Sequence, residues 1–313
     1  MLTLNNVTIT FEDTVTGNDA YYKASRKATI KVVEKNFFAE DIKVSLDKRY
    51  NNETEYKSVD LKLDFKAAAN ETDTYEALIE FTDDADYILD VEYTDKSGNI
   101  YEYDKDIRFT VDTIAPVISL AYEDSDTADY YNSDRIAKVT VNEHNFNPDG
   151  ITLNVIGNTT NTDGTINTVN LTEKYQKMLR ETEWKNDRDI YVGYVEITDE
   201  ARSSLELSYT DPAGNVSNVV SDEFVIDKQA PTNLEIKYSE PVNKIQEWFY
   251  GDEIEVTISA FDSISGIDGF EYSYTVSNDV SSRNKGKENV KVTADMIVDG
   301  TYTFKIPAQF RGC

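Results

Sequence analysis

The side chains best suited to chemistry in this sequence are oxygen donors that recur in two similar settings. In each setting an aspartate and an asparagine stand four residues apart in Asp-x-x-Gly-Asn, and a second aspartate follows shortly before an Ala-Pro pair. The six candidates are Asp95, Asn99, Asp112, Asp211, Asn215 and Asp227. Calcium takes six to eight oxygen ligands from carboxylates, carbonyls and asparagine side chains. The pattern predicts calcium as a candidate cofactor, bound at the junctions between domains.

The same residues also have a plain structural interpretation. In Asp-x-x-Gly-Asn the aspartate can accept backbone N–H groups and the glycine can take positive φ, which makes a tight turn without an ion. The motif Glu-x-Asn-Phe, which begins at Glu34 and again at Glu143, has two interpretations as well. Its phenylalanine could close one end of a core, or its glutamate could face a domain junction and help to hold a cation. The sequence leaves both alternatives open.

Catalytic chemistry has little support in these residues. His144 is the only histidine, and Lys35 occupies its place in the first copy of the repeat, so we expect a loop residue there. The sequence has no Gly-x-Ser-x-Gly elbow, no Gly-x-x-x-x-Gly-Lys-Ser/Thr loop and no His/Cys cluster with zinc spacing. We therefore expect a protein that is not an enzyme.

The charge balance and the single cysteine narrow the partners further. Thirty-one Lys and Arg face 59 Asp and Glu, for a net charge of −28, which repels nucleic acid and anionic lipid. Cys313 is the only cysteine, so the chain has no intramolecular disulfide. No apolar run approaches the roughly 20 residues that a membrane-spanning helix requires. We expect neither nucleic-acid binding nor direct membrane insertion.

A long internal repeat defines the elements that position the candidate residues. The segment AYYKASRKATIKVVEKNF (20–37) returns as DYYNSDRIAKVTVNEHNF (129–146), 109 residues later, and YTDKSGN (93–99) returns as YTDPAGN (209–215). A period of about 110 residues fits one sandwich domain of roughly 100 residues. Apolar residues alternate within each copy, as at Ala28, Ile30 and Val32, which indicates half-buried strands.

These patterns predict three all-β domains, 1–112, 113–227 and 228–313, each with the fold of an immunoglobulin-like β-sandwich and arranged end to end. The Ala-Pro pairs after the first two predict short, extended linkers. The third domain has no counterpart of the YTDxxGN block, so we expect it to be incomplete, without its last strands. Leu171, Tyr175, Met178 and Leu179 have helical spacing, with Asn170 and Glu173 as a capping box, and predict a short helix or turn.

Aromatic side chains offer one more binding interpretation. Trp184, Trp248, Phe249 and Tyr250 are of the type that stacks on sugars. Aromatic residues at strand positions of a sandwich more often belong to its core.

The Tyr-Thr-Asp-x-x-Gly-Asn turn, the closing Phe-x-x-Asp, the following Ala-Pro and the Asp262-Ser-Ile-Ser-Gly-Ile267 segment together resemble bacterial immunoglobulin-like repeats of cell-surface and secreted proteins. The resemblance covers essentially the whole chain and is weaker in the third domain. It implies an extracellular place, at the cell surface or cell wall, with the signal and anchor outside this sequence. In that family such repeats commonly form stalks, and some carry ligand-binding surfaces.

We therefore expect a non-catalytic spacer, or stalk, whose partners are neighbouring modules of the same polypeptide. The alternative is an adhesin or accessory module that binds host matrix protein or polysaccharide and is appended to a carbohydrate-active enzyme.

Overall fold

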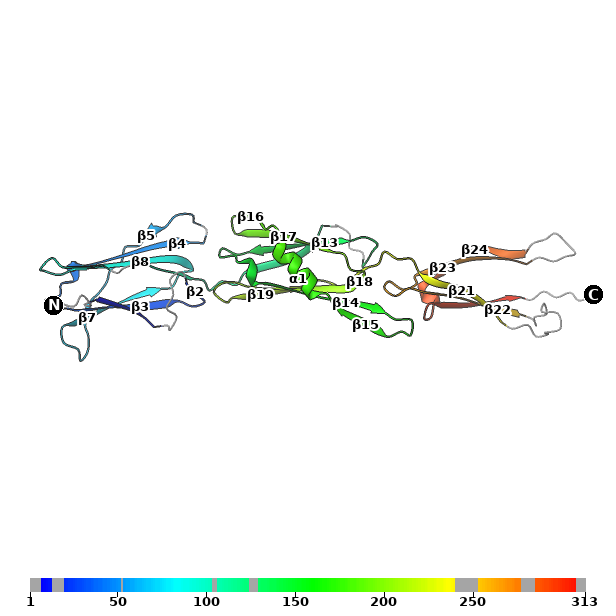
Figure 1. The fold of residues 1–313 in the computed structure, drawn as a ribbon, viewed down its shortest axis with the longest axis horizontal. Coiled ribbons are helices and arrows are strands. Elements are labelled where there is room, and N and C mark those ends of the chain that lie inside the picture. Colours follow the sequence, from blue (N-terminus) through cyan, green and yellow to red (C-terminus); the bar gives the residue numbers. More distant parts are fainter. Residues whose placement is uncertain are drawn as a thin grey trace, which may run out of the picture.

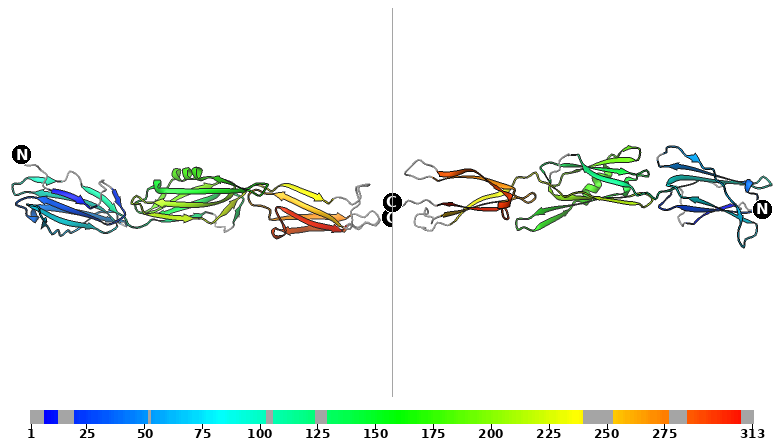
Figure 2. Two further views of the ribbon diagram at one scale, coloured as in Figure 1. Left: turned by 90° about the horizontal axis from the view of Figure 1, so that it is seen from below. Right: turned by 180° about the vertical axis from the view of Figure 1, so that it is seen from behind.

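The computed structural model describes residues 7–12, 20–51, 53–102, 106–123, 129–239, 253–276 and 285–307. These residues form β-sheets and one α-helix, arranged as three sandwiches in a row along the long axis of the molecule (Figure 1). Two further views show the same end-to-end order, without one sandwich lying back on another (Figure 2). The predicted fold class, all-β with tandem immunoglobulin-like sandwiches, is confirmed. No helix in the described part of the chain is long and apolar enough to span a membrane.

The first sandwich, residues 7–111, consists of two facing sheets. The first sheet contains, in spatial order, β1 (Val7–Phe11), β3 (Arg26–Val33), β7 (Thr74–Phe81) and β6 (Lys66–Ala67). The second contains β2 (Ala20–Tyr22), β10 (Ile107–Val111), β8 (Ala85–Thr94), β4 (Ile42–Tyr50) and β5 (Lys57–Ser58), with β9 (Ile100–Glu102) beside β8. This division matches the two sheets of an immunoglobulin-like sandwich. Strand β10 runs parallel to β2 and antiparallel to β8.

The second sandwich, residues 117–226, repeats this topology. Its first sheet contains β11 (Val117–Tyr122), β13 (Arg135–Asn142), β17 (Ile190–Ile197) and β16 (Lys185–Asp187). Its second contains β12 (Tyr130–Tyr131), β20 (Phe224–Ile226), β18 (Ala201–Thr210), β14 (Ile151–Thr160) and β15 (Ile166–Asn170), with β19 (Val216–Val220) beside β18. Strand β20 again runs parallel to β12.

The predicted helix is present as α1 (Thr172–Glu181) and packs against β14 and β17. Tyr175 and Leu179 are its buried residues. The predicted capping box is wrong, because Leu171 is the N-cap and has no side-chain cap hydrogen bond. The Oδ1 atom of Asn170 instead accepts the N–H of Thr172 at 2.9 Å, one residue inside the helix.

Alternating burial along the strands builds each core. In β3 and β13 every second side chain is buried, and in β8 the fully buried residues include Leu89 and Val91. The phenylalanine of Glu-x-Asn-Phe packs at the edge of each core: Phe37 stacks on Tyr75 and Phe146 on Tyr191. Trp184 packs against Phe146 with ring centroids 5.0 Å apart and belongs to the margin of the core. Trp248, Phe249 and Tyr250 lie outside the described residues.

A buried arginine explains the repeated Tyr-Tyr and Arg positions. The Arg135 guanidinium is 3.7 Å from the ring centroids of both Tyr122 and Tyr131, and the residue is only 5% exposed. Arg26 occupies the same place in the first sandwich, 3.6 Å from the ring of Tyr22. Aromatic faces attract a guanidinium most strongly when water is excluded, so the pair forms part of the core.

The third unit has fewer strands in its described residues. One sheet contains β21 (Thr232–Tyr238), β22 (Glu253–Phe261) and β25 (Thr301–Pro307), and the other contains β23 (Gly269–Val276) and β24 (Lys285–Thr293). No described strand corresponds to β8 or β10, which lie at the centre of a sheet in the first sandwich. The buried apolar residues described here are accordingly few: Val256, Ile258 and Val292.

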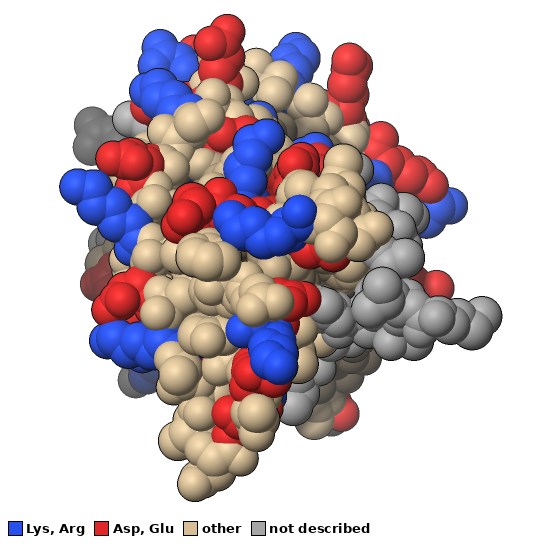
Figure 3. All heavy atoms as spheres, turned by 90° about the vertical axis from the view of Figure 1, so that its left-hand side faces the viewer, with Lys and Arg blue, Asp and Glu red and all other residues tan. Residues whose placement is uncertain are grey.

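Acidic and basic side chains are interspersed on the surface. The view onto the N-terminal end of the row shows both signs around neutral residues (Figure 3). Charge is therefore not gathered into one acidic face at this end.

Candidate cation site at the first junction

Three buried carboxylates meet where the first sandwich joins the second. Asp112 follows β10 in the linker, Glu143 follows β13, and Asp211 begins the turn between β18 and β19. One oxygen from each lies within 4.8 Å of the others. The three residues are 1%, 6% and 4% exposed, respectively. The linker thus brings its aspartate against two loops of the second sandwich.

Asp112 is held by both sandwiches. Its N–H donates to the Tyr22 carbonyl at 2.9 Å, which ties the linker to the first sandwich. Its carbonyl accepts the side-chain amide of Asn215 at 2.9 Å, and its Oδ2 accepts that of Asn145 at 3.3 Å. These bonds join the sandwiches through buried polar groups, which require partners when they leave water.

The Asp-x-x-Gly-Asn segment makes the predicted turn. Asp211 accepts both the N–H and the side-chain amide of Asn215 at 2.8 Å, and Gly214 has a φ of +90°. The turn also aims Asn215 at Asp112. The segment therefore acts both as a turn and as part of the junction, because the turn holds Asn215 in the position where it contacts Asp112.

Burial of the Glu143 carboxyl raises its pKa from 4.5 to about 7, and the charges of Asp112 and Asp211 act in the same direction. Burial raises the pKa of Asp112 also. Three close carboxylates out of water repel one another, and protons or a divalent cation relieve this repulsion. The three carboxylates are oxygen donors of the type that calcium prefers, while Asn145 and Asn215 turn their amide N–H groups toward them.

A second polar contact crosses the junction beside this cluster. The His144 ring lies 3.1 Å from Asp189 through Nδ1 and 3.8 Å from Asp86 of the first sandwich through Nε2. The nearby Asp86 and Asp189 carboxylates raise the pKa of His144. Burial opposes the charged form of Asp86, yet the nearby His144 ring and hydrogen bonds from Thr110 and Arg49 lower its pKa to about 2. His144, expected to be a loop residue, follows β13 in a loop and also contacts the neighbouring sandwich.

The six predicted ligands do not group as the sequence suggested. The sequence pattern groups Asp112 with Asp95 and Asn99, because all three close the first repeat. Val111 pairs with Ala85 at the start of β8, whereas Asp95 follows the end of β8, so the linker aspartate lies at the opposite end of the sandwich. Asp112 meets Asp211 and Asn215 instead. Asp227 is separated from those two residues for the same reason, since Ile226 pairs with Ala201 at the start of β18.

Asp227 lies at the second junction, which is built differently. Its Oδ2 accepts the N–H of Ser265 at 3.2 Å. The Asp262 carboxylate accepts three consecutive N–H groups, those of residues 264–266, and so shapes the adjoining turn. The Thr160 N–H donates to the Ser263 carbonyl at 2.6 Å. Backbone groups take part in most of these contacts, in contrast to the carboxylates of the first junction.

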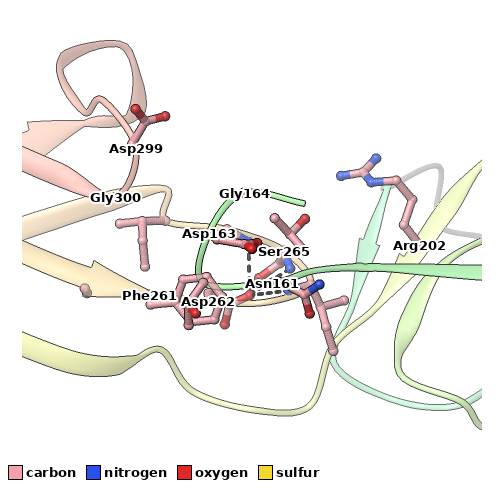
Figure 4. Close-up of a pocket in the computed structure, with 15 residues that line it drawn as sticks. Asn161, Asp163, Gly164, Arg202, Phe261, Asp262, Ser265, Asp299 and Gly300 are labelled. Carbon is pink, nitrogen blue, oxygen red and sulfur yellow. Dashed lines mark hydrogen bonds between the residues drawn. The ribbon is translucent and has the colours of Figure 1, made fainter. Parts of the chain in front are cut away.

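An open cleft of about 550 Å³ lies between the second sandwich and the third unit. Figure 4 shows Asp163 and Asn161 facing the turn of Asp262 and Ser265, with Arg202 and Asp299 further out. Its walls are mixed in polarity and broadly open to solvent.

Two features of the first junction were not predicted as site residues. Asn145 belongs to the repeated Glu-x-Asn motif, so the repeat itself carried a signal for it. The sequence contains no signal for Asp86, because its role depends on contact with the neighbouring sandwich.

Neither a scan against models of protein families nor a search of the curated proteins found a match for this chain.

Proposed function

We propose that this chain is a non-catalytic spacer that holds a functional part of a larger protein away from its point of attachment. The observation that carries the proposal is the end-to-end row of sandwiches joined by a buried polar junction (Figure 1). A freely flexible tether would not need side chains from both sandwiches to bury hydrogen bonds around the linker.

The structural support lies in how the linker is fixed. Asn215 and Asn145 both donate to Asp112, and His144 reaches Asp86 across the same junction. Each contact restricts bending between the two sandwiches, because rotation would leave a buried polar group without its partner. The resemblance to bacterial surface repeats supports a place outside the cell, at its surface or in the wall.

Calcium is the cation we propose for the first junction. Asp112, Glu143 and Asp211 would supply carboxylate oxygens, and water oxygens would complete the set. Asn215 and Asn145, whose amides donate to Asp112, would contribute oxygens only after their amide groups rotate. Binding would neutralise the cluster and stiffen the linker.

The second candidate function is recognition of a host protein or polysaccharide. The cleft between the second sandwich and the third unit favours it, because Asp163, Arg202 and Asp299 present both charge signs to solvent there. Specific retention of the chain on a matrix-protein or glycan array would support this candidate.

Small-angle scattering tests the spacer. A compact globule of this length has a radius of gyration of roughly 20 Å. Three sandwiches in a row, each about 35 Å long from strands of about ten residues, give about 30 Å. A value near the larger figure in both chelator and millimolar calcium supports a spacer. A value near the smaller figure would overturn it and favour a composite binding site.

A further inference from the structure

The N-terminal end of the first sandwich repeats the residues that the second sandwich uses to receive its neighbour. Glu34, Asn36, Asp95 and Asn99 stand where Glu143, Asn145, Asp211 and Asn215 stand in the second sandwich. Both sets follow the equivalent strands, β3 with β8 and β13 with β18. The only member of the junction set without a counterpart in the described part of this end is the linker aspartate.

The local geometry of the two ends is the same. Asn99 donates its N–H and side-chain amide to Asp95 at 2.8 and 2.6 Å, as Asn215 does to Asp211. The N–H of Asn36 donates to Glu34 at 3.1 Å, as Asn145 does to Glu143. A receiving surface is therefore already formed at the first sandwich.

The two ends differ in exposure. Asn215 is only 2% exposed and Asp211 only 4%, because the first sandwich covers them. Asn99 and Asn36 are exposed, and Glu34 and Asp95 are partly exposed. This is the end that faces the viewer in Figure 3.

A buried tyrosine hydroxyl also lies at this end of the first sandwich. The Tyr93 hydroxyl is buried and has no hydrogen-bond partner among the described residues. Tyr93 lies near the end of β8, two residues before Asp95 of the receiving surface. Burial raises the pKa of Tyr93 to about 12, with Glu34, Asp41 and Asp95 adding to the effect. Its counterpart Tyr209 accepts the Asn147 N–H at 3.0 Å. The Tyr93 hydroxyl lacks this bond and is available to donate a hydrogen bond to an arriving group.

Charge indicates which kind of sandwich fits. At the first junction His144 lies beside Asp86, and Lys35 occupies the position of His144 in the first sandwich. A neighbour with an acidic residue at the position of Asp86 would pair with Lys35. Arg202 of the second sandwich is equivalent to Asp86, since each pairs with the last strand of its sandwich. A sandwich with an arginine at this position would repel Lys35.

We propose that the N-terminal end of the first sandwich is a docking surface for another sandwich of the same polypeptide. The occupant ends as the first sandwich does, with a linker aspartate and an acidic residue at the position of Asp86. This inference rests on the proposed spacer function and extends it to a further module.

An extended chain tests the docking surface. Residues 1–116 are placed ahead of the full chain in place of residues 1–5, and the added copy carries Ile100→Val, so that its peptides differ in mass. Hydrogen exchange is then followed in the peptide covering residues 94–102. We expect exchange in the original first sandwich to slow by about tenfold relative to the unextended chain. The same peptide in the added copy should remain fast, because its own end stays open.

Asp112→Asn in the added copy is the matched variant, and it should reduce the protection while both sandwiches stay folded. Equal exchange in the two copies would overturn the docking surface. Scattering of the same extended chain separates this outcome from failure of the spacer. A longer rod with equal exchange refutes only the docking surface, whereas a compact particle refutes the spacer itself.

Discussion

Replacing Glu143 by glutamine tests the buried carboxylate cluster most directly. Glutamine keeps the size of the side chain and an oxygen that can accept the Asn145 N–H, but it removes one charge. Its amide can also donate to the Asp112 or Asp211 carboxylate, which lies within the same cluster. The variant therefore removes repulsion without leaving a cavity.

The pKa gives the size and sign of the effect. Folding raises the pKa of Glu143 from 4.5 to about 7, so the folded chain binds more protons between these pH values. The free energy of unfolding therefore falls as pH rises through this range, and the loss is complete above pH 7. At about 1.4 kcal/mol per pKa unit, the loss is on the order of 3 kcal/mol. Glu143→Gln should match the unaltered chain at pH 4.5 and exceed its stability at pH 8 by up to that amount.

Urea unfolding in chelator, followed by Trp184 fluorescence, measures the change. Trp184 packs against Phe146 in the second sandwich. The sequence has one other tryptophan, so Trp248→Phe in every sample makes the signal specific. Glu34→Gln is the matched control, because Glu34 begins the same Glu-x-Asn-Phe motif at the N-terminal end of the first sandwich. An unchanged pH profile for Glu143→Gln, or an equal gain for Glu34→Gln, would refute the reasoning.

Three further predictions use related measurements. At pH 8, calcium at 100 times its dissociation constant should raise the unfolding free energy of the second sandwich by about 2.7 kcal/mol. Asp211→Asn should abolish this gain. An equal gain in the unaltered chain and the variant would argue against this site. Arg135→Ala should destabilise the second sandwich by about 2–3 kcal/mol in the Trp184 assay, because it removes a buried cation and its packing, whereas Arg26→Ala should leave that transition in place. Hydrogen exchange should open β21–β25 before β3, β8, β13 and β18, since few apolar residues are buried in the third unit; equal protection would contradict this.

The sequence predicted the features that depend on local periodicity. Ala28, Ile30 and Val32 alternate in the sequence and are fully buried in the structure, because one face of a strand packs against the opposite sheet. The repeat likewise predicted tandem sandwiches, since similar sequences build similar units.

What the sequence could not predict depends on which ends of strands lie together. Asp95 and Asp112 are close in sequence but follow antiparallel strands, so they lie at opposite ends of one sandwich. The side-chain amides that bind Asp112 come from the next sandwich, Asn145 33 residues and Asn215 103 residues further along the chain. Arg135 illustrates another limit, because an arginine normally indicates exposure and only the aromatic rings around it explain its burial.

The parallel pairing of β2 with β10 has a mechanical consequence. When tension acts on the two ends of the first sandwich, these strands are pulled in opposite directions along their length. Their hydrogen bonds are then loaded in shear and must break together, whereas bonds pulled open from one end break one at a time. The second sandwich has the same arrangement in β12 and β20, and the described strands of the third unit do not. In single-molecule pulling we expect the third unit to unfold first, at a force that leaves the first two sandwiches folded.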